Sequence, residues 1–482
     1  MKRIRSLAFF LAFLMLATLL ASCGDSVNDP AESTSDPAIQ SSVPIPSQTT
    51  TPAVATNAPE NTGFDGYAFN IGASEIEKYY PKRDESGAYQ SALDEEWGKL
   101  YEDLETQYNF SFNFEYADNS MEKVTLMLLT GEYPYDVQEL RTAVAFPLAA
   151  RGQIADYGSA EMLAAGLDVT DETLFYQPIT QWTNINGGTW GVRFASKFYL
   201  PEFGYCMIFN KAMADTAGYP ADTLYQMVRD GKWNFSVYKE LCAGLVKDTD
   251  GDGNYDIWAT GGGYNPYASE IMLAGGNAVS YIDGKWVYTL DSAESMDGMQ
   301  FMYDEFNTFG WRHTGGAGEA RTLFSEEQIG MIWAAGFYLT NETITGCEFE
   351  YGILPMPKGD NVEDYVDVLS TPIVLSMYAG NLDYDKNVQI MKLWAGVMNS
   401  PDNWQERVME EFCRGNEIDF EMLTEYVFSK LKFGTYKLNS DMEKYIEQNC
   451  MNKIYNGELT PAAAVEAVMA QAQTLLDDMF NQ

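Results

Sequence analysis

Histidine and basic residues are scarce in this sequence. His313 is the one histidine among 482 residues, which excludes a metal site with several histidines. A Ser-His-Asp hydrolase would have to use His313 as its catalytic histidine. Lys and Arg number 30 against 70 Asp and Glu, which gives a formal net charge of −40. So large an acidic excess argues against binding nucleic acid or an anionic membrane surface through a basic face.

Cysteine is scarce as well. Besides Cys23, the chain has five widely spaced cysteines and no C-x-x-C pair. The odd number excludes a complete disulfide framework, and the spacing disfavours a zinc site. We expect mostly buried free thiols, and one or two disulfide bridges are the alternative. The five are Cys206, Cys242, Cys347, Cys413 and Cys450.

Long apolar runs are absent except near the N-terminus. There, three basic residues within the first five precede an apolar run over 7–20, which is short for a transmembrane helix. Small residues then lead to Cys23. This pattern predicts a secretory signal over 1–22 and resembles the lipobox of bacterial lipoproteins, which implies lipid on the Cys23 sulfur. The alternative is an ordinary signal peptide with an incidental cysteine.

Large apolar residues are few in the segment after this signal. Residues 23–63 are rich in Ser, Thr, Pro, Ala and Asn, and such a composition cannot bury enough surface to fold. We predict a disordered linker there. It would tether a soluble body to the outer face of the bacterial cytoplasmic membrane.

The rest of the chain is rich in apolar and aromatic side chains. Apolar residues make up 46% of the sequence and aromatic residues 14%, which suffices for a large core. Apolar positions recur at helical spacing over 89–108 and alternate as in a strand over 110–116. Such segments continue to alternate, which predicts an α/β fold with largely parallel sheets. The last hundred residues have mainly helical patterns, including 460–480.

An aspartate-rich loop over 248–256 is the most specific local motif. Carboxylates at its first, third and fifth positions converge when the chain turns sharply at the sixth, Gly253. This is the geometry of an EF-hand-type calcium loop, although Ala259 stands where the bidentate glutamate would be. We predict a structural Ca²⁺ site, with a solvated acidic turn as the alternative. The predicted ligands are Asp248, Asp250, Asp252, Asn254 and Asp256.

Several short segments occur in an order typical of one family. Each is weak alone, and together they cover nearly everything after residue 64. The segments are 135–137 (Tyr-Asp-Val), 188–192 (Gly-Thr-Trp-Gly-Val), 207–211 (Met-Ile-Phe-Asn-Lys), 232–235 (Lys-Trp-Asn-Phe) and 351–359 (Tyr-Gly-Ile-Leu-Pro-Met-Pro-Lys-Gly). In this order they resemble the family 1 extracellular solute-binding proteins of ABC transporters, the type that binds sugars and oligosaccharides.

The resemblance implies a type II periplasmic-binding-protein-like fold, in which two α/β lobes joined by a hinge close over a ligand. The N-terminal lobe would comprise 64–195 plus 328–370, and the C-terminal lobe 196–327 plus 371–482. The ligand would lie between them, at the carboxyl ends of strands. The chain would then be a monomer without catalytic residues. It would deliver a carbohydrate to the transmembrane subunits of an ABC permease.

The resemblance and the chemistry of sugar recognition also suggest ligand contacts. Aromatic rings cover the C–H faces of sugars, and polar side chains bond to the hydroxyl groups. Tyr267 and Phe337 match family positions whose rings stack on sugar, and the other candidates lie near such positions or near strand ends. For each aromatic residue, burial in the core is the alternative. The candidates are Tyr267, Phe337, Trp333, Tyr338, Glu139, Arg141, Asn70 and Tyr436.

Two other functions stay open. A lipid-anchored carbohydrate-active enzyme, such as a glycoside hydrolase, would use two positioned carboxylates. With 70 acidic residues, candidate pairs are easy to find and prove nothing. The other alternative is a binding protein for a solute that is not a sugar.

Overall fold

The computed structural model describes residues 63–199, 202–262, 269–369, 372–401, 403–434 and 438–480. The predicted signal peptide, Cys23 and all but the last residue of the predicted linker lie outside this part of the chain, as do the ligand candidates Tyr267 and Tyr436. Among the described helices, none is long and apolar enough to cross a membrane.

The first sheet has four strands in the order β13-β3-β1-β2. Strands β1 (Tyr67–Ala73), β2 (Phe110–Tyr116) and β3 (Val137–Arg141) are parallel, as the alternation of strands and helices predicts. Strand β13 (Ile373–Ser376) is antiparallel to β3 and closes one side of the sheet.

The second sheet has the order β11-β6-β10-β7. Strands β7 (Trp258–Gly262) and β10 (Ile329–Ala335) are parallel, whereas β6 (Tyr205–Asn210) runs antiparallel to both β10 and β11 (Tyr351–Pro355). Nearly every residue of these strands is buried, as expected for a sheet covered on both faces.

Short strand pairs and helices complete the fold. The small pairs are β4 (Asn184–Ile185) with β5 (Gly188–Thr189), β8 (Val279–Ile282) with β9 (Lys285–Tyr288), and β12 (Asp367–Val368) with β14 (Leu431–Lys432). The helices up to the second sheet are α2 (Ala92–Tyr108), α3 (Met121–Thr130), α4 (Thr142–Ala150), α5 (Ala160–Ala164) and α6 (Gln177–Trp182). The following helices are α7 (Lys211–Thr216), α8 (Ala221–Arg229), α9 (Phe235–Leu245), α10 (Ser269–Leu273), α11 (Ala293–Asn307), α12 (Ala317–Ser325), α13 (Gly336–Leu339) and α14 (Glu342–Thr345). The last are α15 (Gln389–Met398), α16 (Trp404–Arg407), α17 (Glu417–Tyr426), α18 (Ser440–Ile446), α19 (Asn452–Tyr455) and α20 (Pro461–Phe480).

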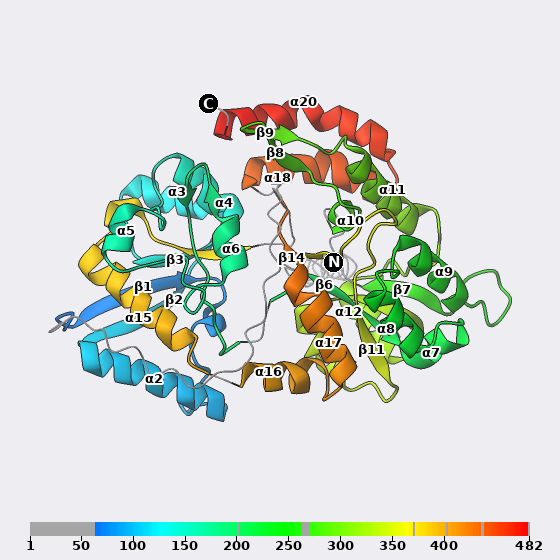
Figure 1. Cartoon of the computed structure of the whole chain (residues 1–482), viewed down its shortest axis with the longest axis horizontal. Coiled ribbons are helices and arrows are strands. Elements are labelled where there is room, and N and C mark those ends of the chain that lie inside the picture. Colours follow the sequence, from blue (N-terminus) through cyan, green and yellow to red (C-terminus); the bar gives the residue numbers. More distant parts are fainter. Residues whose placement is uncertain are drawn as a thin grey trace, which may run out of the picture. The chain divides into compact units, whose positions relative to one another are not determined.

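The alternating phenylalanines of β2 build the core of the first sheet. The ring centroids of Phe112 and Phe114 each lie 5.8 Å from that of Trp394 in α15. The Trp394 indole N–H donates a 2.6 Å hydrogen bond to the hydroxyl of Tyr101 in α2, so this buried polar pair is satisfied. Figure 1 shows α15 (yellow) alongside the blue strands β1 and β2, although the two segments are far apart in the sequence.

Sheet membership differs from the expected lobe boundaries. Segment 328–370 was expected with the first lobe, but its strands β10 and β11 both pair with β6 of the second sheet. Segment 371–482 was expected with the second lobe, but β13 pairs with β3. These strands are short, almost entirely buried and mostly apolar, so their sequence patterns do not distinguish the two sheets. Pairing between strands far apart in the sequence decides which sheet each one joins.

Candidate functional site

At the carboxyl edge of the first sheet, Glu139 braces a loop. Its side chain is fully buried. Oε2 accepts hydrogen bonds from the amides of Ser74 and Glu75 and from the Ser74 hydroxyl, at 2.8, 3.2 and 2.7 Å. Oε1 accepts a 3.1 Å bond from the Tyr79 hydroxyl. Because both oxygens are engaged, Glu139 holds the loop that follows β1.

Arg141 is the last residue of β3 and links this edge to the C-terminal helices. Its Nη2 lies 2.9 Å from Oε1 of Glu443 in α18. The Arg141 side chain is about a third exposed (32%), whereas Glu443 is 11% exposed. This ion pair therefore sits at the border between buried and open surface.

Asn70 lies inside β1, opposite Asn113 of β2, and not in the loop after the strand. Its side-chain amide donates to the carbonyl of Ala68 at 3.1 Å and accepts from Asn113 Nδ2 at 2.9 Å. The strand continues for three residues beyond Asn70, to Ala73. Asn70 is thus set back from the edge where the parallel strands end.

At the carboxyl edge of the second sheet, the predicted aromatic cluster divides into buried and exposed rings. Trp333 and Tyr338 are 2% and 1% exposed, whereas Phe337 is 48% exposed. Trp333 lies in the covered strand β10, and the guanidinium of Arg312 lies 4.9 Å from the centroid of its ring. Helix α13 begins directly after β10, which brings Phe337 to the edge. Of these three rings, Phe337 is the one open to a ligand.

Arg321 is a candidate contact that sequence reasoning missed. Its guanidinium carbon lies 4.5 Å from the ring centroid of Tyr338 and 6.0 Å from that of Phe337. It forms no ion pair with a described residue. A guanidinium beside an exposed ring can donate hydrogen bonds to sugar hydroxyl groups. Its position on helix α12 gave no signal that would separate it from any solvated charge.

The acidic loop gathers part of its predicted ligand set. Carboxylate oxygens of Asp248, Asp250 and Asp256 all lie within 4.8 Å of one another. Gly253 has φ of +94°, the sharp turn that the motif predicts. Asp252 instead accepts hydrogen bonds from the backbone and side-chain amides of Asn254, at 2.8 and 3.1 Å. The three converging carboxylates suit a hard cation that prefers oxygen ligands.

Asp367 joins two segments that connect the sheets. Its buried carboxylate accepts hydrogen bonds from the amide of Gly204 at 2.9 and 3.0 Å and from that of Tyr205 at 3.0 Å. A Cβ at position 204 would lie 1.9 Å from the carbonyl oxygen of Val368, so only glycine fits there. Burial raises the pKa of the Asp367 carboxyl to about 7, because its desolvation outweighs the backbone hydrogen bonds that favour the charged form.

Glu202 lies in the same connecting segment and has the opposite environment. It forms ion pairs with Arg193, at 2.6 Å, and with Lys78. Burial alone would raise the pKa of the Glu202 carboxyl, but these two cations outweigh it and hold the pKa at about 2. The ion pairs of Glu202 therefore hold this segment to the lobe of the first sheet. The hydrogen bonds to Asp367 hold it to β12.

The five described cysteines are free thiols, as predicted. Four are buried, and Cys347 is partly exposed. Burial raises the pKa of Cys413 and of Cys450 to about 12, which keeps both thiols protonated and unreactive.

The two sheets, their flanking helices and their connections define a mixed α/β protein of the type II periplasmic-binding-protein-like fold, the fold of the solute-binding proteins of ABC transporters. No family model and no curated protein matches the sequence. The likeness is to solved structures.

Three of these structures come from different bacteria. An ABC transporter solute-binding protein from Thermotoga lettingae, bound with α-D-tagatose, is 15% identical with a TM-score of 0.56, and the match covers 86% of this chain and 100% of that one. UgpB from Mycobacterium tuberculosis, in complex with glycerophosphocholine, is 15% identical with a TM-score of 0.56, over 85% and 98% of the chains. The maltose/maltodextrin-binding domain MalE from Bdellovibrio bacteriovorus, bound to maltotriose, is 15% identical with a TM-score of 0.55, over 85% and 100%. At these identities the likeness establishes the fold.

Proposed function

We propose that this chain is a family 1 extracellular solute-binding protein that captures a sugar or oligosaccharide and delivers it to an ABC permease. The observation that carries the proposal is the fold, which matches sugar-bound binding proteins over nearly their whole length. Phe337 supports it, since an exposed ring at the carboxyl end of β10 is where a sugar face would stack. Lobe closure over that ligand completes the proposal.

The proposed lobes follow the sheets. The first comprises residues 64–195 with 372–399, and the second comprises 205–369 with 404–480.

The N-terminal signal and Cys23 would place the protein as a lipid-anchored monomer on the outer face of the cytoplasmic membrane. Palmitate labelling of a Cys23→Ser variant beside the wild type tests the anchor, since the variant should lose the label.

A thermal-shift screen of residues 24–482 against mono- and oligosaccharides tests the binding function. A ligand at 100 times its dissociation constant adds about 2.7 kcal/mol of stability, which raises the melting temperature by a few degrees. A stabilising sugar that is recovered unchanged supports a binding protein. Release of new reducing ends would support a glycoside hydrolase, and stabilisation by other solutes alone would point to a ligand that is not a sugar.

We also propose that the acidic loop binds Ca²⁺ and that the ion is structural. Converging oxygens of Asp248, Asp250 and Asp256 support this role. Calcium titration by calorimetry should show one site that Asp250→Asn weakens. Asp84→Asn is a matched control, because Asp84 also accepts amide hydrogen bonds in an exposed turn but belongs to no described acidic cluster. Equal calcium binding by both variants would exclude the loop.

A further inference from the structure

A hollow of about 520 Å³ lies beside the acidic loop, at the amino edge of the second sheet. Trp258 is the first residue of β7, and its amide donates a 2.8 Å hydrogen bond to the carbonyl of Gln328, just before β10. Phe337 follows the opposite end of β10, a strand of seven residues that spans roughly 20 Å. The hollow is therefore separate from the proposed sugar site.

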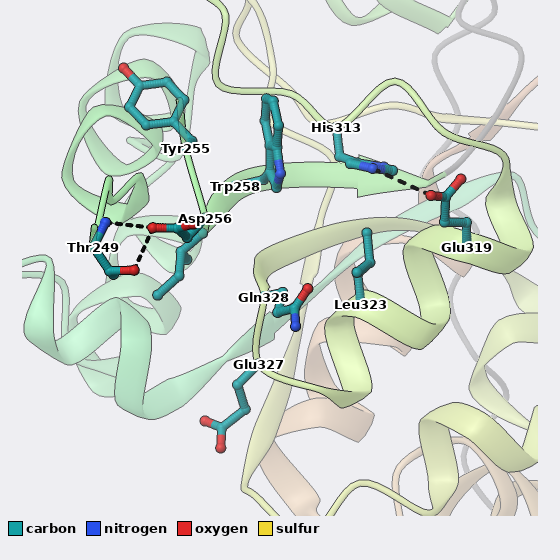
Figure 2. Close-up of a pocket in the computed structure, with 10 residues that line it drawn as sticks. Thr249, Tyr255, Asp256, Trp258, His313, Glu319, Leu323, Glu327 and Gln328 are labelled. Atoms are coloured by element: carbon teal, nitrogen blue, oxygen red, sulfur yellow. Dashed lines mark hydrogen bonds and ion pairs between the residues drawn. The ribbon is translucent and has the colours of Figure 1, made fainter. Parts of the chain in front are cut away.

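Three rings form one side of the hollow. Trp258 stands between Tyr255 and His313 (Figure 2). The Tyr255 and Trp258 centroids are 6.0 Å apart with an interplanar angle of 81°, and those of Trp258 and His313 are 5.6 Å apart with an angle of 76°. Successive rings are thus nearly perpendicular. They therefore do not form the flat platform on which a sugar face would stack.

The charge of the hollow has one sign. Three of its lining residues carry carboxylates, Asp256, Glu319 and Glu327, and none of the described residues that line it is Lys or Arg. Glu319 is 60% exposed, and its carboxylate lies 3.7 Å from Nε2 of His313. Acidic walls around a concave site attract cations and reject anions.

His313 contributes the third ring of the hollow. Its Nδ1 accepts a 3.2 Å hydrogen bond from the amide of Gly315, and its Nε2 faces Glu319. This arrangement fixes the ring as a third aromatic surface. Figure 2 shows Asp256 on the Tyr255 side of the row of rings and Glu319 on the His313 side.

We propose that this hollow binds a small organic ammonium cation, independently of the ligand at the carboxyl edge. Tyr255, Trp258 and His313 all line the hollow, and the face of an aromatic ring attracts a cation that lies within about 6 Å of the ring centroid. The nearby carboxylates supply long-range attraction. The hollow has room for an alkylated ammonium group.

Choline and its uncharged carbon isostere, 3,3-dimethylbutan-1-ol, are matched probes for this site. Each probe is mixed with residues 24–482, and saturation-transfer NMR is read on the methyl signals of the probe. Choline should give a millimolar dissociation constant. The isostere should bind on the order of fivefold more weakly or not at all, since it lacks the charge that the rings and carboxylates attract. Equal binding of the two probes, or none of choline, would overturn the proposal.

Variants locate the binding. Trp258→Ala and Tyr255→Ala should each lower choline affinity several-fold, Trp258→Phe should lower it less, and Glu319→Gln should lower it slightly. Tyr281→Ala is the matched control, because Tyr281 is 44% exposed, close to the 39% of Tyr255, and lies on β8 away from the hollow. An unchanged choline affinity in Trp258→Ala would assign the binding to the protein's general negative charge and reject the site. The series is repeated with CaCl₂, because Asp256 also belongs to the acidic loop.

Discussion

The carboxyl edges of the two sheets use their polar side chains differently. At the first edge, Glu139 is saturated with hydrogen bonds and Arg141 is held by Glu443. At the second, Phe337 is open, and Arg321 beside it has no carboxylate partner among the described residues. A polar residue near a strand end can therefore either stabilise a loop or contact a ligand. The burial of its side chain distinguishes the two roles.

The largest effect should come from the brace. Glu139→Ala removes a buried acceptor of four hydrogen bonds and should lower the free energy of unfolding by about 3 kcal/mol or more. Glu139→Gln keeps an acceptor oxygen and should cost less. Urea unfolding curves measure both. Unchanged stability together with lost sugar binding would instead make Glu139 a ligand contact and remove the contrast between the edges.

The connection between the two edges should respond to pH through Asp367. Its pKa of about 7 in the folded protein lies above the ordinary 3.8, so folding takes up a proton in this window. The stability that this carboxyl contributes is fully present below about pH 4 and is lost as the pH rises through 7. Asp367→Asn should gain stability relative to the wild type over this range, by up to about 1.4 kcal/mol per pH unit. Parallel pH profiles of the melting temperature would contradict this prediction.

The open edge should show an effect on affinity and little on folding. Phe337→Ala should weaken sugar binding about tenfold, since one stacked ring contributes on the order of 1.4 kcal/mol. Phe337→Trp should preserve binding, and both should unfold like the wild type. Calorimetric titration with the sugar found in the screen provides the measurement. Full affinity in Phe337→Ala would move the ligand away from this edge.

The smallest effect should come from the bridge at the first edge. Arg141→Gln breaks the ion pair with Glu443, and because the Arg141 side chain is about a third exposed, the loss should cost about 1 kcal/mol. The loss should shrink at high salt. A double-mutant cycle with Glu443→Gln isolates the pair. A loss of sugar affinity without a loss of stability would show that Arg141 contacts the ligand after all.

The sequence predicted local structure well and long-range pairing less well. The alternation in β2, helix α20 and the turn at Gly253 follow from patterns that neighbouring residues determine. The sheet that each of β10, β11 and β13 joins could not be predicted from such patterns, because the sequence of a buried apolar strand does not indicate its partner strand.

Predicting the site had a similar limit. Trp333 and Phe337 are both large rings close to the end of one strand, and the fold alone decides that one is buried and the other open. Arg321 comes near Phe337 only when α12 packs beside β10, so its place could not be inferred from the chain. Tyr267 and Tyr436 remain predictions.

The first sheet is built from strands that lie far apart in the sequence, and this limits the order in which the chain can fold during synthesis. Strands β1 to β3 are complete at residue 141, but β13 begins at residue 373, which is 232 residues later (373 minus 141). Trp394, on which the phenylalanines of β2 pack, comes later still. The emerging N-terminal half therefore lacks part of its own core until most of the chain has been made, and such non-local completion slows folding.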